Sequence, residues 1–402
     1  MSGEKPDGWR VGSLGDLILL EYGKSLPEAK RVPGPFPVYG SSGIVGFNER
    51  ALVSAPGIII GRKGTVGSVI FADSDFWPID TTYFVSRRGD FDLRWIYYLL
   101  QHVDLAQLNE ATGVPGLNRD KAAKVSVVIP PLSEQRRIAE VLSSVDEAIQ
   151  AAQAVIEQTR KVKQGVLTRL LTKGVGHTRF KQTEIGEIPE EWEALSLEHC
   201  GVSIIDGDRG KEYPKAADYS DTGHCLFLSA QNVTKRGFSF DTAQFISRER
   251  HEKLRKGVVE RGDVVITTRG TVGNLAYYDQ SIPHDLMRIN SGMAILRTDG
   301  RKVYPRYLYA ALTSPVVEKQ IEKLTFGSAQ PQLTIKIIKG LVIPVPSGEE
   351  QELVARRCAE LAQAVQEGEQ HLAALHSFKS ALMADLLTGR KRVFTDLPMA
   401  AE

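Results

Sequence analysis

The stretch SEQRRIAEVLSSVDEAIQAAQAVIEQTRKVKQGVLTRLLT, residues 133–172, decides the fold of this chain. Beginning at Ile138, side chains that suit a buried seam recur at alternating intervals of four and three residues. A repeat of 3.5 residues is typical of a helix that buries one stripe against another helix in a coiled coil. Two prolines ending at Pro131 and the suitable N-cap Ser133 mark its start, and Gly174 marks its end.

The same spacing recurs near the C-terminus, beginning at Val354. Both stretches open with a Glu-Gln pair and close with Leu-Leu-Thr, and a lysine occupies the same seam position in each, at Lys163 and Lys379. A polar seam residue sets the register of a coiled coil, which accounts for both lysines. Gly368 on the second seam predicts a local kink or weaker packing. The predicted seam comprises Ile138, Leu142, Val145, Ile149, Ile156, Val354, Leu361, Val365, Leu372 and Leu375.

The composition is that of an ordinary folded protein with two or three domains. Of its 402 residues, 42% are hydrophobic and 25% are charged. The formal charge of +1 gives no global basic field for nucleic acid, although it permits a local basic patch. Three separated cysteines without a CxxC pair indicate a reducing compartment and no structural zinc. We expect a cytoplasmic protein without a membrane span, because we find neither a long apolar run nor a signal-peptide core.

Short β-like runs separated by glycine-rich turns fill the rest of the chain. An apolar strand ending at Ile60 runs into GRKGTVG, and one ending at Ile266 runs into TTRGTVG. A helix is expected at 93–108 in the first half and at 307–324, broken at Pro315, in the second. The sequences between Trp192 and the second GTVG turn show no counterpart in the first half, which predicts unrelated inserts on two shared frames.

These patterns predict an α+β fold, in which two long helices that form an antiparallel coiled coil separate two pseudo-repeated mixed α/β domains. The predicted boundaries are 1–132 for the first domain, 133–173 for the first helix, 174–188 for the linker, 189–346 for the second domain, 347–389 for the second helix, and 390–402 for a C-terminal tail that returns toward the first domain.

Motifs that would indicate an enzyme are incomplete. Gly23-Lys24-Ser25 ends like a phosphate-binding loop, but Ile18 stands where the earlier glycine is required. Residues 61–67 read G-x-x-G-x-x-G and lack dinucleotide spacing. The run Ile-Pro-Pro-Leu at 129–132 lacks the polar first residue and the aromatic of an adenine methylase, and the histidines form no metal-binding pair. We predict no catalytic site and no metal site.

The two GTVG turns are better candidates for a binding site. Their hydroxyl, arginine and lysine side chains suit phosphate oxygens or guanine, although a tight hairpin with solvated charges remains an alternative. The polar loop at 206–211 differs from its counterpart and either reads bases or merely turns. The candidate DNA-binding residues are Ser41, Ser42, Arg62, Lys63, Thr65, Arg209, Lys211, Thr267, Arg269 and Thr271.

The phrase GHTRFKQTEIGEIPEEW at 176–192, together with the duplicated Glu-Gln at the start of both helices, resembles the specificity (S) subunit of Type I restriction–modification systems. The resemblance spans nearly the whole chain. It implies two target-recognition domains, each reading half of a bipartite double-stranded DNA site, and a coiled coil that acts as a spacer. It further implies two methyltransferase (M) subunits docked on the coiled coil, which carry S-adenosylmethionine and methylate adenine N6, and a restriction/translocase (R) subunit that joins for cleavage. This chain itself would be non-catalytic and would bind no cofactor.

Physical reasoning agrees with this resemblance and leaves one rival. A helix of about 38 residues is ~57 Å long, which would separate two DNA-reading domains by one to two helical turns of DNA. The rival is a non-DNA-binding coiled-coil scaffold with two protein-interaction domains, which the near-neutral charge favours. Sequence-dependent affinity for DNA distinguishes the two.

Overall fold

The structure is a computed structural model that describes residues 6–108, 116–325 and 332–393. It divides into two compact units, residues 1–154 with 369–402, and residues 155–368. Each unit holds one mixed α/β domain and part of each long helix. Within the described residues, no helix is long and apolar enough to cross a membrane.

An antiparallel four-stranded sheet forms the centre of the first domain. Its order is β2 (Ile18–Tyr22), β8 (Thr82–Arg87), β5 (Gly57–Gly61) and β6 (Val69–Ala72). All five residues of β5 are buried, as expected for a central strand covered on both faces. The remaining strands are β4 (Gly43–Asn48), β3 (Phe36–Gly40) and β7 (Trp77–Pro78) in a second sheet, and β1 (Arg10–Ser13) paired with β9 (Ser126–Ile129). The helices are α1 (Leu14–Leu17), α2 (Leu93–His102) and α3 (Arg119–Ala123).

The second domain is built around an equivalent sheet, β13 (Val202–Asp206), β22 (Met293–Thr298), β19 (Val264–Thr267) and β20 (Leu275–Tyr277). A second four-stranded sheet has the order β17 (Phe245–Ile246), β14 (Cys225–Leu228), β21 (Met287–Ile289) and β18 (Val258–Val259). The other strand pairs are β12 (Glu193–Ser196) with β23 (Val342–Val345), β15 (Val233–Thr234) with β16 (Gly237–Phe238), and β10 (Phe180–Thr183) with β11 (Gly186–Pro189). The helices are α5 (Arg248–Lys253), α6 (Pro305–Leu312), α7 (Pro315–Thr325) and α8 (Ile335–Lys339).

The two domains repeat one topology more completely than the sequence indicated. Beside the matching four-stranded sheets, each domain pairs two strands in parallel, β3 with β7 and β14 with β21. A Cβ atom on Gly23 would lie 2.1 Å from the Ile79 carbonyl oxygen, and one on Gly207 would lie 2.1 Å from that of Asn290. Both strand ends therefore need glycine for the same close backbone approach. The inserts still differ, because the second domain adds β15, β16, α5 and β18 and has a four-stranded second sheet where the first domain has a three-stranded one, so the shared part is the parallel pair and the glycine that precedes it.

One helix prediction needs correction and the other is confirmed. α2 ends at His102, and a 3₁₀ turn at Leu105–Leu108 follows Asp104, whose φ is 50°. In the second domain the predicted break at Pro315 is confirmed, because α6 ends at Leu312 and Pro315 opens α7. Proline is tolerated there because the first turn of a helix needs no N–H donor.

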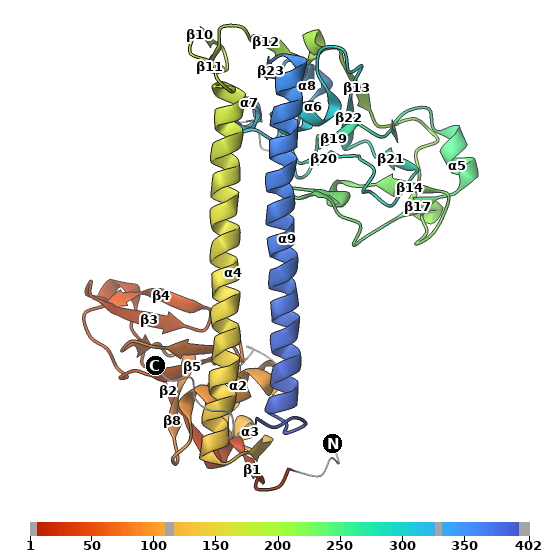
Figure 1. Cartoon of the computed structure of the whole chain (residues 1–402). Coiled ribbons are helices and arrows are strands. Elements are labelled where there is room, and N and C mark those ends of the chain that lie inside the picture. Colours follow the sequence, from red (N-terminus) through yellow and green to blue (C-terminus); the bar gives the residue numbers. More distant parts are fainter. Residues whose placement is uncertain (1–5, 109–115, 326–331, 394–402) are drawn as a thin grey trace. The chain divides into compact units, whose positions relative to one another are not determined.

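The long helices are α4 (Leu132–Thr172) and α9 (Gly348–Leu386), and each is unbroken (Figure 1). In the first unit, Ile138 and Leu142 near the start of α4 share a core with Leu386 at the end of α9. In the second unit, Leu171 near the end of α4 shares a core with Val354 near the start of α9. These pairings are antiparallel, and the predicted fold class is confirmed.

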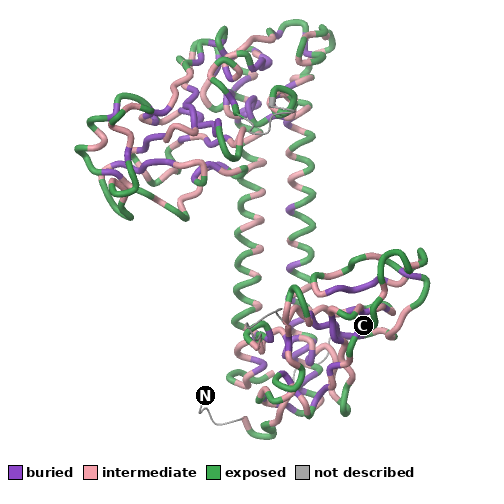
Figure 2. Tube along the Cα trace, turned by 180° about the vertical axis from the view of Figure 1, so that it is seen from behind, coloured by how far each residue is buried: buried purple, intermediate pink, exposed green. Residues whose placement is uncertain are grey.

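The seam is buried most deeply along α4. Figure 2 shows single buried positions spaced along the long helices, whereas buried residues run together in the sheets. Most of the predicted seam is buried, whereas Leu361, Val365, Leu372 and Leu375 are only partly covered. At Gly368 itself the helices lie close together, because Ile156 is 4% exposed and its Cγ1 would lie 2.9 Å from a Cβ at that position, although the neighbouring seam residues Val365 and Leu372 are less covered than those of α4.

Candidate nucleic-acid interface

Four backbone segments meet at one end of the four-stranded sheet in each domain. In the first domain the register brings together the ends of β2 and β5 and the starts of β8 and β6. In the second domain β13, β19, β22 and β20 meet in the same way. We call this end the reading edge, with residues 22–25, 62–68, 79–81 and 116–117 in the first domain, and residues 206–211, 268–274, 290–292 and 332–333 in the second.

The turn after β5 brings several predicted site residues together in the first domain. The hydroxyl of Ser41, between β3 and β4, accepts from the Thr65 N–H at 3.4 Å. The Ser68 hydroxyl donates to the Ser41 carbonyl at 2.5 Å. Ser42, Lys63 and Thr65 are exposed around this junction. The β3–β4 turn thus contributes to the same surface as the GTVG turn.

Arg62 has a role that sequence reasoning did not foresee. Its Nε and Nη2 donate to the Asp80 carbonyl at 3.1 and 2.6 Å. Its guanidinium lies 5.3 Å from the ring centre of Tyr22, and that of Arg119 lies 5.2 Å from the same ring. Arg62 therefore ties two segments of the reading edge together.

Tyr22 and Arg119 are candidate site residues that the sequence analysis missed. Tyr22 is 49% exposed at the end of β2 and packs at 5.1 Å against Tyr83. Burial and contact with Tyr22 raise the pKa of Tyr83 to about 12. The sequence contained one indication of this site. The glycine after Tyr22 marks the end of a strand and is not part of a phosphate-binding loop.

The turn after β19 corrects one prediction. Thr267 is fully buried, and its hydroxyl donates to the Thr271 carbonyl and accepts from the Asn274 N–H at 2.9 Å. The Thr267 side chain therefore closes the turn and is not available to DNA. Arg269 and Thr271 are exposed on the same turn.

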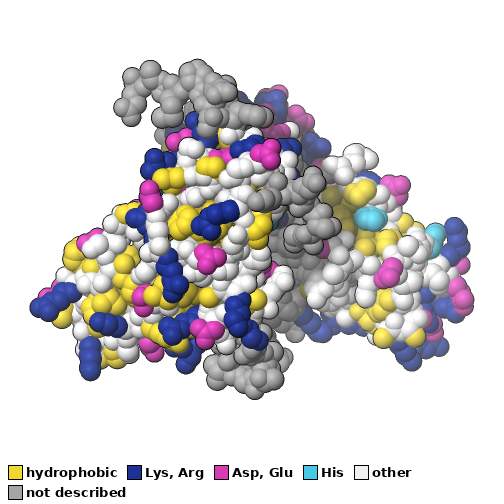
Figure 3. Space-filling model, turned by 90° about the horizontal axis from the view of Figure 1, so that it is seen from below, with side chains coloured by type: hydrophobic (Ala, Val, Ile, Leu, Met, Phe, Trp, Pro, Cys, Tyr) yellow, Lys and Arg dark blue, Asp and Glu magenta, His cyan; other side chains and the backbone are white. Residues whose placement is uncertain are grey.

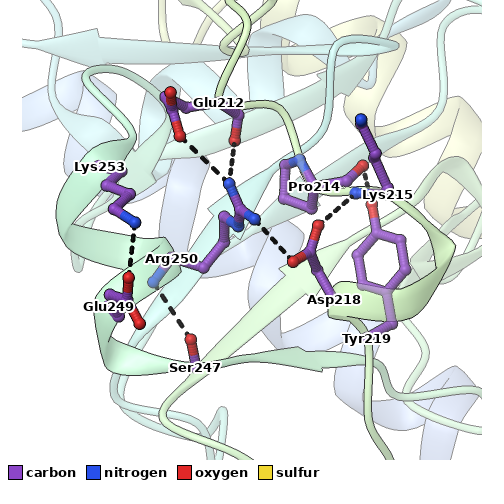
Figure 4. Close-up of polar contacts among 9 residues, drawn as sticks. All are labelled: Glu212, Pro214, Lys215, Asp218, Tyr219, Ser247, Glu249, Arg250 and Lys253. Carbon is purple, nitrogen blue, oxygen red and sulfur yellow. Dashed lines mark hydrogen bonds and ion pairs between the residues drawn. The ribbon is translucent and has the colours of Figure 1, made fainter.

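Arg250 of α5 anchors the loop after β13 (Figure 4). It donates to the carboxylates of Glu212 and Asp218 at 3.3 and 2.7 Å. These contacts of Arg250 hold the backbone of the loop after β13 in place. Lys211 is exposed on this loop. Arg209, also exposed, forms an ion pair with Asp206 at 3.0 Å at the end of β13.

Asp208 fixes the same loop from inside. Its carboxylate accepts from the backbone N–H groups of Gly210 at 2.9 Å and Arg255 at 2.8 Å. Burial raises its pKa, but these hydrogen bonds and the nearby Arg255 charge outweigh burial, so the pKa of Asp208 is lowered. A loop held in this way presents its outward side chains at defined positions.

One face of the described part of the chain carries charges of both signs. On the face seen in Figure 3, Lys and Arg side chains are dispersed among acidic and apolar ones.

Within the described ranges, no group of three or more His, Cys, Asp or Glu residues is placed to hold a metal ion. A cavity of about 590 Å³ lies at the opposite end of the first sheet, where Asp73, Arg87 and Arg94 line it.

The comparison with known families agrees with this geometry. The family model described as the Type I restriction modification DNA specificity domain matches residues 6–159 and 189–372. The chain therefore belongs to the Type I specificity-subunit family, which conveys DNA sequence specificity and is not catalytic. The family predicted from the linker phrase is confirmed.

Particular relatives resemble the chain over most of its length. It is 27% identical to the Type I restriction enzyme MjaVIII specificity subunit of Methanocaldococcus jannaschii, over 96% of this chain and 94% of that protein. It is 24% identical to the EcoBI specificity subunit of Escherichia coli, over 76% of this chain and 66% of that protein. The crystal structure of a Type I S subunit from M. genitalium matches with a TM-score of 0.62 at 18% identity, over 94% of this chain and 96% of that one. This structural match shows the fold.

Proposed function

We propose that each domain reads one half of a bipartite double-stranded DNA site through its reading edge. The observation that carries this proposal is a repeated backbone frame with different side chains on it. Lys63 and Arg269 occupy the same place in two turns whose backbone N–H groups bind equivalent carbonyls, those of Thr81 and Gly292. Because the backbone repeats and the side chains on it differ, the two domains are suited to two different half-sites.

The long helices set the unspecified gap between the half-sites. α4 has 41 residues and is ~61 Å long at 1.5 Å per residue. Each long helix contributes residues to both units, so its length enters the spacing of the two half-sites in this proposal.

The long helices also dock the methyltransferase subunits. Val155 and Val162 lie one heptad apart on α4 and are 63% and 45% exposed, and Phe378 on α9 is 55% exposed. Exposed apolar side chains on one face of a helix suit a protein partner. The repeated domain supports two methyltransferase subunits per chain. They carry S-adenosylmethionine and methylate adenine N6, this chain binds no cofactor, and a restriction/translocase subunit joins the complex for cleavage.

Selection of duplexes from a random pool tests the DNA-reading function. The chain, purified with its methyltransferase subunit, should enrich a split motif with a fixed gap. Replacing both Lys63 and Arg269 by Ala should abolish the enrichment while the two proteins still co-purify. Co-purification without any enrichment by the unaltered complex would favour the scaffold with two protein-interaction domains, which the charge of +1 supports.

A further inference from the structure

The backbone around Arg269 is fixed before any ligand binds. The N–H groups of Thr268 and Arg269 donate to the Gly292 carbonyl at 2.8 and 3.3 Å. The Thr268 carbonyl accepts from the N–H of Leu333, which is 1% exposed, at 3.0 Å. The turn after β19 and the residues before α8 are therefore held side by side.

A single glutamine clamps the Arg269 side chain. With its amide oxygen turned toward the guanidinium, Gln332 accepts from Nε and Nη2 of Arg269, both at 3.0 Å. Gln332 is itself placed by the neighbouring Leu333, which is buried in the core of the second domain. Among the described residues, no carboxylate pairs with Arg269 at ion-pair distance. Within the part of the chain that the structure describes, the guanidinium is thus oriented by a neutral acceptor and not by a carboxylate.

No described residue forms a hydrogen bond with the other edges of the Arg269 guanidinium. Arginine has five N–H donors, and Gln332 uses Nε–H and one hydrogen of Nη2. One hydrogen of Nη1 and the second hydrogen of Nη2 lie side by side at the end of the guanidinium and form the terminal fork. Guanine presents two acceptors, O6 and N7, to such a fork in the major groove, whereas adenine presents one acceptor and one donor. A fork that approaches this edge of a base accepts guanine and rejects adenine.

We propose that Arg269 contacts a guanine in the half-site of the second domain, and that Gln332 is the positioning residue that orients its guanidinium. The inference rests on the proposed DNA-reading function. It assigns a base to one position, which the family and the fold leave open.

The first domain supplies an internal comparison. Lys63 takes the place of Arg269, and Gly116, which precedes Leu117, takes the place of Gln332. A lysine offers a point charge without a fork, and a glycine has no side chain to orient it. The first domain therefore has no equivalent arginine clamp at this position.

The test uses the complex of this chain with its methyltransferase subunit and a duplex that carries the selected motif. Guanines of the motif are replaced one at a time by 7-deazaguanine, which removes only the N7 acceptor. At one guanine the unaltered complex should bind about tenfold more weakly, since a hydrogen bond to a charged group is lost. Arg269→Ala should bind the unmodified duplex roughly 10- to 100-fold more weakly and be indifferent to that replacement.

Variants at Gln332 distinguish a role in orienting Arg269 from a role in the folding of the second domain. Gln332→Ala should weaken binding at the same guanine and add little in combination with Arg269→Ala, because the two residues act as a unit. Gln332→Glu, which keeps an acceptor oxygen, should retain selectivity for that guanine. Arg301→Ala, an exposed arginine beyond the other end of β22, is the matched control and should bind like the unaltered complex.

Different failures have different meanings. If the unaltered complex selects no motif, the proposed DNA-reading function fails. A second outcome is that the complex selects a motif, while each 7-deazaguanine replacement weakens binding of Arg269→Ala as much as it weakens binding of the unaltered complex. In that case the proposed contact between Arg269 and a guanine is wrong. If Gln332→Ala retains full selectivity, the positioning role is wrong.

Discussion

The indole N–H of Trp192 donates a hydrogen bond to the carboxylate of Glu350 at 2.9 Å. Trp9 donates to Glu134 at the same distance in the other unit. The tryptophan near the start of each domain is therefore bound by the glutamate near the start of the long helix that leaves that domain. This explains why a Glu-Gln pair opens both helices.

The glutamine of each pair binds a different part of the same domain. Gln135 accepts from the N–H of Asp92, the N-cap of α2, at 3.0 Å. Gln351 accepts from the N–H of Tyr304, the N-cap of α6, at 2.9 Å. Each Glu-Gln pair thus joins a long helix to the entrance and to the main helix of its domain.

Glu134→Ala should destabilise the first unit by about 2 kcal/mol, because it leaves the buried Trp9 N–H unpaired and removes the partner of Arg392. Denaturant unfolding of the full chain measures the loss. Glu140→Ala is the control, since its pair with Arg137 lies on the surface and contributes at most ~1 kcal/mol. Equal unfolding midpoints for the two variants would contradict the role of this contact.

Two glycines inside the long helices should respond oppositely to alanine. Gly165→Ala should stabilise by about 1 kcal/mol, because alanine favours helix and a Cβ there meets nothing within 4 Å. Gly368→Ala should lose that gain and destabilise by roughly 1–3 kcal/mol, since its Cβ would lie 2.9 Å from Ile156. Thermal unfolding measures both, and a rise in Tm for Gly368→Ala would show that the seam can open there.

The second domain should lose stability as the pH falls through about 6.5, the ordinary range of histidine. Nδ1 of His251 accepts from Nε of Arg288 at 3.0 Å, so the folded state needs a neutral ring. Burial, Arg288 and then His224 lower the pKa of His251, which Glu252 opposes and Arg248 reinforces. As the pH falls, His251 therefore binds a proton in the unfolded chain before it does so in the folded chain. The contribution of His251 to stability is complete above this pH range and declines below it.

Urea unfolding at pH 7.5 and 5.5 measures this dependence. His251→Gln should be less stable than the unaltered chain at pH 7.5 but should lose less stability at pH 5.5. An unchanged difference between the two pH values would show that His251 does not titrate in this way.

Removing one heptad from both α4 and α9 should shorten the gap in the DNA motif. Seven residues span ~10.5 Å of helix, or about three base pairs at 3.4 Å each. Removal from α4 alone is the control, because it puts the two seams out of register and should unfold the coiled coil. The same gap with both helices shortened would mean that the helices do not set the spacing.

The long-range architecture could be predicted from sequence because it rests on periodicity. The seam from Ile138 and its repeat from Val354 predicted both helices, since a helix repeat fixes which side chains face a partner. The recurring GTVG turns likewise predicted two domains built on a shared frame. These features depend on residues that lie close together in the chain.

The details of the site depend on contacts between distant segments, which no local pattern contains. Thr267 resembles a surface hydroxyl in sequence, but the turn that follows it buries it. Gln332 carries no motif, and its role depends on the turn that places Arg269 beside it. The common backbone of Gly23 and Gly207 was hidden for the same reason, because their partners are carbonyls far along the chain.

The central claim, that this chain directs methylation to a bipartite DNA site, is tested most directly by single-molecule sequencing of genomic DNA. Cells would express the methyltransferase subunit with this chain or without it. The account predicts N6-methyladenine in a split motif with one fixed gap, present only when this chain is expressed. Methylation that is the same with and without the chain, or that has no split motif, would contradict it.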